Sequence, residues 1–210
     1  MLVAEAPLRS ARLATPADLG AIARIHKSAY SRNHFTALLS EAVLERYYAA
    51  FLSDGAEILL EIETGEGHRD VLLGFAVYGL RIPEKIAAFK RSSAKAILLT
   101  SLQHPWISAR KALKAVAALS AKREPYPPAD FLLLSIAVAH PLAGVGKTLL
   151  NRMLAAAARS GHAVAGLYVN NDNIRAINAY YSAGFRIKHL EDGQYYMEAP
   201  VRAACTGLHP

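Results

Sequence analysis

The feature that most limits the fold is a near-continuous apolar run, Phe131–Val138, which leads through a short glycine-containing loop into an amphipathic helix predicted over 144–159. Such a run is expected of a strand buried on both faces, because a half-exposed strand alternates apolar and polar residues. The helix carries an apolar stripe and stops at Gly161, the usual terminating residue type. The segment therefore predicts a central strand followed by a helix, as in an α/β architecture.

Apolar periodicity predicts the remaining elements. Helical spacing is present over 18–30, 40–52 and 173–183. Strand-like runs predict two antiparallel hairpins and one further strand: 56–63 with 71–80, 185–190 with 194–197, and 163–170 alone. Between the first hairpin and the central strand lies a basic segment, 82–124, whose spacing is mostly helical. The order is helix, helix, strand pair, basic segment, strand, helix, strand, helix, strand pair.

The length of 210 residues predicts one domain over 1–200, with 82–124 as an insertion and 201–210 as a C-terminal tail. No stretch approaches the roughly 18 uninterrupted apolar residues of a membrane span, and the N-terminus lacks a signal-peptide pattern. We therefore expect a cytoplasmic protein. The single cysteine, Cys205, excludes an internal disulfide and a multi-thiolate metal site, and no metal cofactor is predicted.

The net charge of +7 and the isoelectric point near 9.6 suit an anionic cofactor, a nucleic acid or an anionic membrane. Aromatic residues are not interleaved with the basic ones and no finger-like Cys/His spacing occurs, so we expect no nucleic-acid partner. The basic segment 82–124 has three interpretations: a solvated helical cap, a lid that recognises an anion, or a surface in peripheral contact with an anionic membrane.

The loop His140-Pro141-Leu142-Ala143-Gly144-Val145-Gly146-Lys147 has the features of an anion site. Glycines let the backbone approach a ligand, and the first helical turn presents unpaired N–H groups at the positive end of the helix dipole. Pyrophosphate is the natural ligand for such a loop. The alternative is a strand-to-helix turn that needs glycine only for tight packing.

Two families of phosphate-binding loop compete for this segment. Gly146-Lys147-Thr148 is the end of the P-loop NTPase motif, but the residue five before Gly146, which should be glycine, is Pro141. Proline has no N–H to offer a phosphate, and the next predicted strand ends at Asn170 rather than at a magnesium-binding Asp. The nucleotide-binding interpretation is therefore the weaker one.

The segment Asn173-Ile174-Arg175-Ala176-Ile177-Asn178-Ala179-Tyr180-Tyr181-Ser182-Ala183-Gly184-Phe185 resembles the Asn-x-x-Ala-x-x-x-Tyr-x-x-x-Gly-Phe signature of the GCN5-related N-acetyltransferase (GNAT) superfamily. It follows the glycine loop by one helix and one strand, as in that family. Gly144 and Gly146 match the family loop, whereas Pro141 replaces its Gln or Arg. The resemblance covers about residues 10–198. It implies an α/β fold with a central mixed, mostly antiparallel sheet flanked by helices, and a basic helical insertion between the third and fourth strands.

The resemblance also implies the activity: an acyltransferase that passes the acetyl group of acetyl-CoA, a co-substrate, directly to a primary amine in a ternary complex. Tyr180 is then the catalytic residue that protonates the departing sulfur, with simple aromatic packing as the alternative. Asn173 contacts the cofactor, or only caps the helix. The remaining implied cofactor-binding residues lie on the central strand and in the loop: Ile136, Ala137, Val138, Leu142, Ala143, Gly144, Val145, Gly146 and Lys147.

Other features stay open. The general base is one of four candidates: Ser135, Glu61, His26 or His34. The acceptor pocket falls near Tyr30, Asn33, His34 and Phe35. The basic surround favours an anionic small-molecule amine as acceptor. A homodimer is a further expectation, and a non-catalytic acyl-CoA sensor or interaction module is the alternative function.

Overall fold

The computed structural model describes residues 8–30, 34–53, 55–64, 70–106, 109, 126–139 and 144–201. Their strands form a seven-stranded sheet in the order β1-β2-β3-β4-β5-β7-β6, in which only β4 and β5 are parallel. The strands are β1 (Leu8–Leu13), β2 (Ala56–Thr64), β3 (Asp70–Gly79), β4 (Phe131–Val138), β5 (Val164–Asn170), β6 (Arg186–Glu191) and β7 (Gln194–Pro200). This is the mixed, mostly antiparallel sheet that was predicted, with β4 at its centre.

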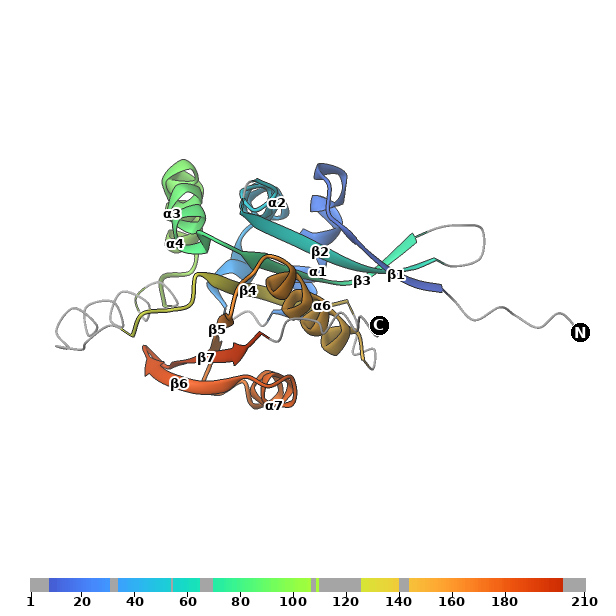
Figure 1. Ribbon diagram of the computed structural model, residues 1–210. Coiled ribbons are helices and arrows are strands. Elements are labelled where there is room, and N and C mark those ends of the chain that lie inside the picture. Colours follow the sequence, from blue (N-terminus) through green and yellow to red (C-terminus); the bar gives the residue numbers. More distant parts are fainter. Residues whose placement is uncertain are drawn as a thin grey trace, which may run out of the picture.

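Helices cover both faces of the sheet. They are α1 (Leu19–Ala29), α2 (Glu41–Ala49), α3 (Ile82–Ser92), α4 (Ala94–Gln103), α6 (Val145–Arg159) and α7 (Ile174–Ser182), with short 3₁₀ turns η1 (Pro16–Asp18) and η2 (Phe35–Leu38). One apolar cluster packs α1 and α2 on one face, and a second packs α6 and α7 on the other. Figure 1 shows α6 in front of the sheet and β5, β6, β7 and α7 in the lower half of the molecule.

The local sequence explains where these helices begin and end. Ser40 caps α2 by accepting a hydrogen bond from the backbone N–H of Val43. Gly144 begins α6 with a φ of 89°, a left-handed conformation that glycine adopts without steric cost. In the β6–β7 turn, between the two strands predicted over 185–190 and 194–197, Asp192 and Gly193 both have positive φ, the conformation of a two-residue hairpin turn.

The structure adds one strand to the sequence predictions and describes part of the basic segment. The strand β1 was not predicted; as an edge strand it pairs only with β2 and carries two arginines, so its apolar pattern is weak. Within 82–124 the structure describes helices α3 and α4, and most of the residues after Trp106 lie outside the described part. None of the described helices has the length and apolar content needed to cross a membrane.

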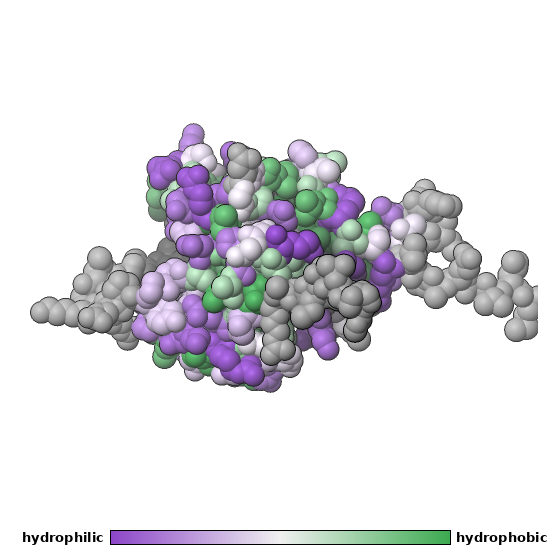
Figure 2. All heavy atoms as spheres, in the orientation of Figure 1, coloured by the Kyte–Doolittle hydropathy of each residue, from purple (hydrophilic) through white to green (hydrophobic). Residues whose placement is uncertain are grey.

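The face of the molecule in Figure 2 is mixed rather than dominated by one kind of residue. On the face in Figure 2, hydrophilic residues cover much of the outline and hydrophobic residues form smaller groups between them. The described part of the chain contains no group of three or more His, Cys, Asp or Glu residues placed to hold a metal ion.

Candidate active site between strands β4 and β5

The site is an opening in the sheet beside β4. β4 pairs with β5 only at Phe131, Leu132 and Leu133, whereas it pairs with β3 as far as Val138. The β3–β4 register shifts at Val77/Tyr78, which leaves Leu134 of β4 as an extra residue. Such a bulge bends a strand and ends its regular pairing. Beyond it, the edge of β4 toward β5 has no strand partner.

Backbone groups of two predicted cofactor residues face this opening. Ala139 donates its N–H to the Leu73 carbonyl of β3, and Tyr30 Oη lies 3.5 Å from the Ile136 carbonyl oxygen on the other side. Because alternate residues of a strand direct their N–H and C=O groups to opposite sides, Ile136 and Val138 present theirs to the opening and Ala137 presents its own to β3. An extended ligand could pair with Ile136 and Val138 as an added strand.

Tyr30 brings a phenol into the opening from the end of α1. The helix stops at this residue, whose extended backbone (ψ 133°) directs the chain away from the helix axis. Tyr30 Oη lies 2.8 Å from Ser135 Oγ, and Ser135 is only 8% exposed. Burial raises the pKa of Tyr30, so its phenol is neutral at physiological pH.

Tyr180, the predicted proton donor, lies close enough to Tyr30 for the two phenols to interact electrostatically. It sits on α7, is 9% exposed and packs edge-on against Phe185. Burial, and secondarily the proximity of Tyr30, raises its pKa well above the usual value for tyrosine. No described residue forms a hydrogen bond with its hydroxyl. The phenol is therefore protonated and available to a ligand.

A third group of side chains joins this site from β5 and β7. Gln194 Nε2 donates to Asn170 Oδ1 at 3.1 Å, and Asn170 Nδ2 lies 3.4 Å from His34 Nε2. The His34 ring in turn makes an edge contact with Tyr30, with 5.3 Å between ring centroids. Because Asn170 uses its oxygen toward Gln194, it presents its amino group to His34, which assigns Nε2 of His34 as the acceptor.

The structure separates the four candidate bases. His26 is 3% exposed and both ring nitrogens are occupied, Nδ1 by Tyr48 Oη at 2.6 Å and Nε2 by Thr36 Oγ1 at 3.0 Å. Burial lowers the pKa of His26 to about 4. These contacts give His26 a structural role in the α1 face of the core.

Glu61 lies on the opposite face of the sheet. It is 3% exposed, and Arg152 Nε of α6 lies 3.3 Å from its Oε2, close enough for an ion pair but without the alignment of a hydrogen bond. β3 separates its strand, β2, from β4. Only Ser135 and His34, of the four candidates, border the opening with Tyr30.

The predicted anion loop is described in part. His140, Pro141, Leu142 and Ala143 lie outside the described residues. Gly144, Val145, Gly146 and Lys147 form the beginning of α6, where N–H groups lack helical acceptors; Val145 is buried and Lys147 exposed. A side chain at Gly144 would meet nothing within 4 Å, so space is open beside it. Asn173 caps α7 by accepting a bond from Ala176 N–H at 3.2 Å, and its amide remains exposed.

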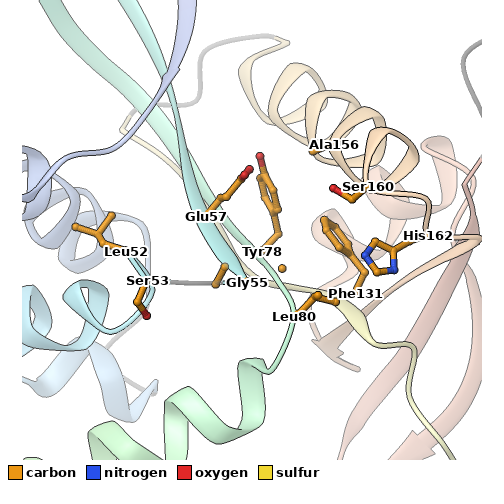
Figure 3. A pocket seen from close by; sticks show the side chains of 12 residues that line it. Leu52, Ser53, Gly55, Glu57, Tyr78, Leu80, Phe131, Ala156, Ser160 and His162 are labelled. Atoms are coloured by element: carbon orange, nitrogen blue, oxygen red, sulfur yellow. The ribbon is translucent and has the colours of Figure 1, made fainter.

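A separate cavity of about 360 Å³ lies where β4 begins, at Phe131, rather than where it parts from β5. Figure 3 shows Glu57 and Tyr78 side by side there, with Phe131, Ser160 and His162 on the side of α6. Tyr30 and the catalytic candidates Ser135 and Tyr180 are not among its lining residues. We therefore place the candidate active site at the opening and not in this cavity.

Known structures share the fold of this chain. No protein-family model matches the sequence, and no curated protein matches it. A crystal structure of the ribosomal-protein-S18-alanine N-acetyltransferase from Escherichia coli is similar, with a TM-score of 0.56, 17% identity and coverage of 97% of this chain and 100% of that one. A structure of a putative acetyltransferase from Salmonella typhimurium with its cofactor acetyl-CoA has a TM-score of 0.56 and 18% identity. The match covers 94% of this chain and 96% of that one. A putative GNAT-family acetyltransferase from Desulfovibrio desulfuricans has a TM-score of 0.55 and 15% identity. The match covers 93% of this chain and 100% of that one.

The chain has the GNAT fold. The prediction made from the Asn173–Phe185 segment is thereby confirmed for the architecture. Identities of 15–18% carry the fold and not the activity or substrate of these neighbours.

Reasoning from the sequence missed two of the polar residues that this GNAT fold brings to the opening. Asn170 and Gln194 are paired across β5 and β7 and share one sheet face, a relation that depends on strand register. The available signal was the alternation of polar residues along β7, where Gln194, Tyr196 and Glu198 occupy every second position. That pattern indicates a polar face but not which strand lies beside it.

Proposed function

We propose that this protein is an N-acetyltransferase that transfers the acetyl group of acetyl-CoA to a primary amine of a small-molecule acceptor in a ternary complex. The observation that carries the proposal is the conjunction, at one opening in the sheet, of unpaired β4 backbone with a buried phenol, Tyr180, that has no hydrogen-bond partner among the described residues. The GNAT fold and its acetyl-CoA-bound neighbour support the choice of cofactor.

The described residues suit acetyl-CoA. Ile136 and Val138 offer backbone N–H and C=O groups along the opening, and α6 offers its N-terminal N–H groups to the pyrophosphate. Gly144 and Gly146 keep that helix start free of side chains. We assign the remaining predicted contacts, from Leu142, Ala143, Lys147 and Asn173, to the same ligand.

The chemistry requires a new bond from the acceptor nitrogen to the acetyl carbon and loss of the bond from that carbon to sulfur. Acetyl-CoA supplies the activated acyl group, and a β4 backbone N–H polarises its carbonyl. Tyr180 donates its hydroxyl proton to the departing sulfur, since its raised pKa keeps it protonated. The acceptor nitrogen releases one proton to a base, and proton exchange with solvent restores Tyr180.

His34 is the favoured base. It is partly buried, borders the opening through Tyr30, and is oriented by Asn170. His26 has both nitrogens occupied, and Glu61 is ion-paired on the far face. Ser135 shares its hydroxyl with Tyr30 and is a poor proton acceptor at neutral pH. Nε2 holds the one lone pair of the neutral His34 ring, so it takes the acceptor proton, directly or through one water molecule, by exchanging its hydrogen bond from Asn170 for one from the acceptor.

Thermal unfolding with acetyl-CoA, CoA or Mg-ATP tests the cofactor. A ligand at 100 times its dissociation constant stabilises the native state by about 2.7 kcal/mol, which raises Tm by several degrees. We expect the two CoA ligands to raise Tm and Mg-ATP to leave it unchanged. The proposal fails if millimolar CoA has no effect, and a rise with Mg-ATP alone would favour a nucleotide-binding loop. Release of free thiol in the presence of amines then tests catalysis.

We propose further that α4 makes the peripheral contact with an anionic membrane. Its exposed side carries Leu98, Leu99, Leu102 and, after its end, Trp106, which is 82% exposed. Exposed cationic residues of α3 and α4 accompany this apolar stripe: Lys90, Arg91 and Lys95. Apolar side chains with a tryptophan and flanking positive charge are typical of helices that lie in a lipid interface.

Sedimentation with vesicles measures this contact. We expect binding to vesicles that contain anionic lipid, loss of binding at high salt, and loss in Trp106→Ala with Leu102→Ser. Trp106→Ala tests the tryptophan alone. The matched control is Leu190→Ser, an exposed leucine on the edge strand β6. Equal binding to neutral vesicles, or equal loss in the control, would contradict the proposal. Homodimerisation and cytoplasmic location stay predictions.

A further inference from the structure

Tyr30 is held at the opening by three contacts. Its backbone N–H donates to the His26 carbonyl oxygen at 3.0 Å, and its ring stacks on the His26 ring with 4.3 Å between centroids. Its hydroxyl oxygen lies 2.8 Å from Ser135 Oγ. His26 is fixed in turn by hydrogen bonds with Tyr48 and Thr36. The backbone, ring and hydroxyl of Tyr30 are thus preorganised to act on a ligand.

The Tyr30 hydroxyl has a proton to offer to such a ligand. Only one hydrogen can lie between Tyr30 Oη and Ser135 Oγ, and either hydroxyl can supply it. When Ser135 donates, the phenol proton can turn toward the Ile136 carbonyl oxygen, which at 3.5 Å makes a long and weak hydrogen bond. Burial raises the pKa of Tyr30, so the phenol keeps this proton at neutral pH. A ligand carbonyl in the opening can therefore accept it.

Ser135 strengthens Tyr30 as a donor. Burial raises the pKa of both Tyr30 and Tyr48, and hydrogen bonding by Ser135 partly offsets both shifts, so its hydroxyl lies within reach of the two phenol oxygens. Ser135 is only 8% exposed. In a site with little water, a hydroxyl that accepts a hydrogen bond is polarised and donates more strongly to the next group.

The shape of the opening directs the thioester of acetyl-CoA toward this hydroxyl. In the proposed site the pyrophosphate lies at the start of α6, and a Cβ at Gly146 would come within 3.8 Å of Val138, so this helix start lies beside the last residue of β4. The unpaired edge of β4 runs back from Val138 through Ile136 and ends at Leu133, where pairing with β5 begins. A ligand that follows this edge brings its thioester to the inner end, where Tyr30 Oη lies.

Tyr30 and Tyr180 approach this place from opposite faces of the sheet. Tyr30 packs against the cluster on the α1 face, and Tyr180 belongs to the cluster on the α6 face. Burial, and secondarily Tyr30, raises the pKa of Tyr180, so the two phenols are near enough to interact. The oxygen and the sulfur of a thioester are bonded to one carbon, and two donors on opposite sides can each serve one of them.

We infer that the Tyr30 hydroxyl, supported by Ser135, donates a hydrogen bond to the carbonyl oxygen of the acetyl group, in addition to the β4 backbone N–H. The inference rests on the proposed acetyltransferase function. As the acceptor nitrogen bonds to the acetyl carbon, the carbonyl oxygen gains negative charge, which the phenol proton stabilises without leaving Tyr30. The oxygen loses this charge when the carbon–sulfur bond breaks and Tyr180 protonates the sulfur.

CoA lacks the acetyl carbonyl, so a comparison of acetyl-CoA with CoA isolates this contact. Calorimetric titration of the full-length protein, without any amine, measures both dissociation constants. Tyr30→Phe keeps the ring that stacks on His26 and removes only the hydroxyl. We expect this variant to bind acetyl-CoA about 5-fold more weakly than the parent, the size of one neutral hydrogen bond, and to bind CoA equally well.

Infrared spectroscopy with an isotope-labelled acetyl carbonyl observes the acceptor atom directly. A hydrogen bond to the oxygen weakens the C=O bond and lowers its stretching frequency. We expect a higher frequency for acetyl-CoA bound to Tyr30→Phe than to the parent. Ser135→Ala should give an intermediate frequency, because Tyr30 keeps its proton and loses its supporting donor. The double variant should match Tyr30→Phe, since Ser135 acts through Tyr30.

Tyr47→Phe is the matched control. Tyr47 is a buried tyrosine of α2 on the same face of the sheet, and its ring packs edge-on against Tyr48 and Phe89. Removal of its hydroxyl should change neither the ratio of the two affinities nor the carbonyl frequency. Changes equal to those in Tyr30→Phe would mean that the α1 face acts through packing alone, and would overturn the inference.

The outcomes separate the inference from the proposed function. An unchanged acetyl-CoA affinity and carbonyl frequency in Tyr30→Phe would overturn the inference, and so would an equal loss of affinity for acetyl-CoA and CoA; binding of CoA to the parent would leave the acetyltransferase proposal standing. If Tyr30→Phe did not fold, an unshifted frequency in Ser135→Ala would overturn the inference and a raised one would support it. A parent protein that binds neither ligand would overturn the proposed function first, and the inference with it.

Discussion

β4 pairs with β3 along most of its length on one side, whereas on the other side its pairing with β5 ends early. On the β3 side pairing continues from Leu132 to Val138, and on the β5 side it stops at Leu133. The closed side is packed so tightly that a Cβ at Gly74 would lie 2.6 Å from the Ala137 carbonyl oxygen. The open side has unpaired backbone, the partly buried phenol of Tyr30 and the buried phenol of Tyr180. One strand thus supplies both the rigidity and the free hydrogen-bonding groups that a catalytic site needs.

The largest effect is expected on the open side, from Tyr180→Phe. Loss of the hydroxyl should lower kcat by about 10²- to 10³-fold, because the departing sulfur loses its proton donor. Stability should hardly change, since no described residue bonds that hydroxyl. Steady-state thiol release and urea unfolding measure the two quantities. The neighbouring Tyr181→Phe, a substitution at a 39% exposed residue, is the matched control. Full activity in Tyr180→Phe would favour an acyl-CoA sensor or a different acid.

On the closed side the expected effect is on stability. Gly74→Ala should lower the free energy of unfolding by about 2 kcal/mol, because the new methyl group forces β3 and β4 apart at Ala137. Urea unfolding measures it. Substitution of a solvent-facing alanine of α3, Ala88→Gly, is the control for a one-methyl change and should cost about 1 kcal/mol from helix propensity alone. If the Gly74→Ala protein were as stable as the parent, β3 and β4 would be able to move apart at Ala137 without a loss of stability.

The same contrast separates what the sequence could predict from what it could not. The central strand, the helix starting at Gly144 and the Asn173 cap follow from local patterns, and the structure places all three where expected. The position at which β4 stops pairing with β5 does not follow from a local pattern, because it depends on a bulge at Leu134 within an otherwise apolar run. The meeting of His34 with Asn170, which are 136 residues apart, depends on the packing of α1 and η2 against the sheet.

His26 shows how local context changed an interpretation. As a histidine on an amphipathic helix it was a candidate base, yet its environment is one of burial with both nitrogens hydrogen-bonded. The His26 ring stacks against the Tyr30 ring with 4.3 Å between centroids. His26 therefore helps to position Tyr30 on the open side and does not itself act as the base.

Acidification should destabilise the α1 face through His26. Its pKa falls from 6.5 when unfolded to about 4 when folded, so the unfolded chain binds the extra proton first. The stabilisation is therefore complete above pH 6.5 and is lost as the pH falls toward 4, by about 2 kcal/mol between pH 7 and pH 5. Urea unfolding at both pH values measures the loss. His26→Gln, which does not titrate, should reduce this dependence, whereas His162→Gln should leave it; equal slopes in all three proteins would contradict the assignment.

The smallest predicted effect concerns the end of the open side, where α6 begins. At Gly146 an added Cβ would meet only Val138 Cγ2 at 3.8 Å, an ordinary contact, so Gly146→Ala should leave the fold intact and strengthen the helix by up to about 1 kcal/mol. In the proposed acetyl-CoA site the same methyl group would stand beside the first-turn N–H groups that bind the pyrophosphate, so we expect CoA affinity to fall by about 10-fold. Calorimetric titration with CoA measures it. A mutation that raises stability and lowers affinity cannot act through unfolding. Unchanged affinity would therefore place the pyrophosphate elsewhere, and the contacts assigned to the start of α6 would have to be withdrawn while the β4 opening and Tyr180 keep their roles.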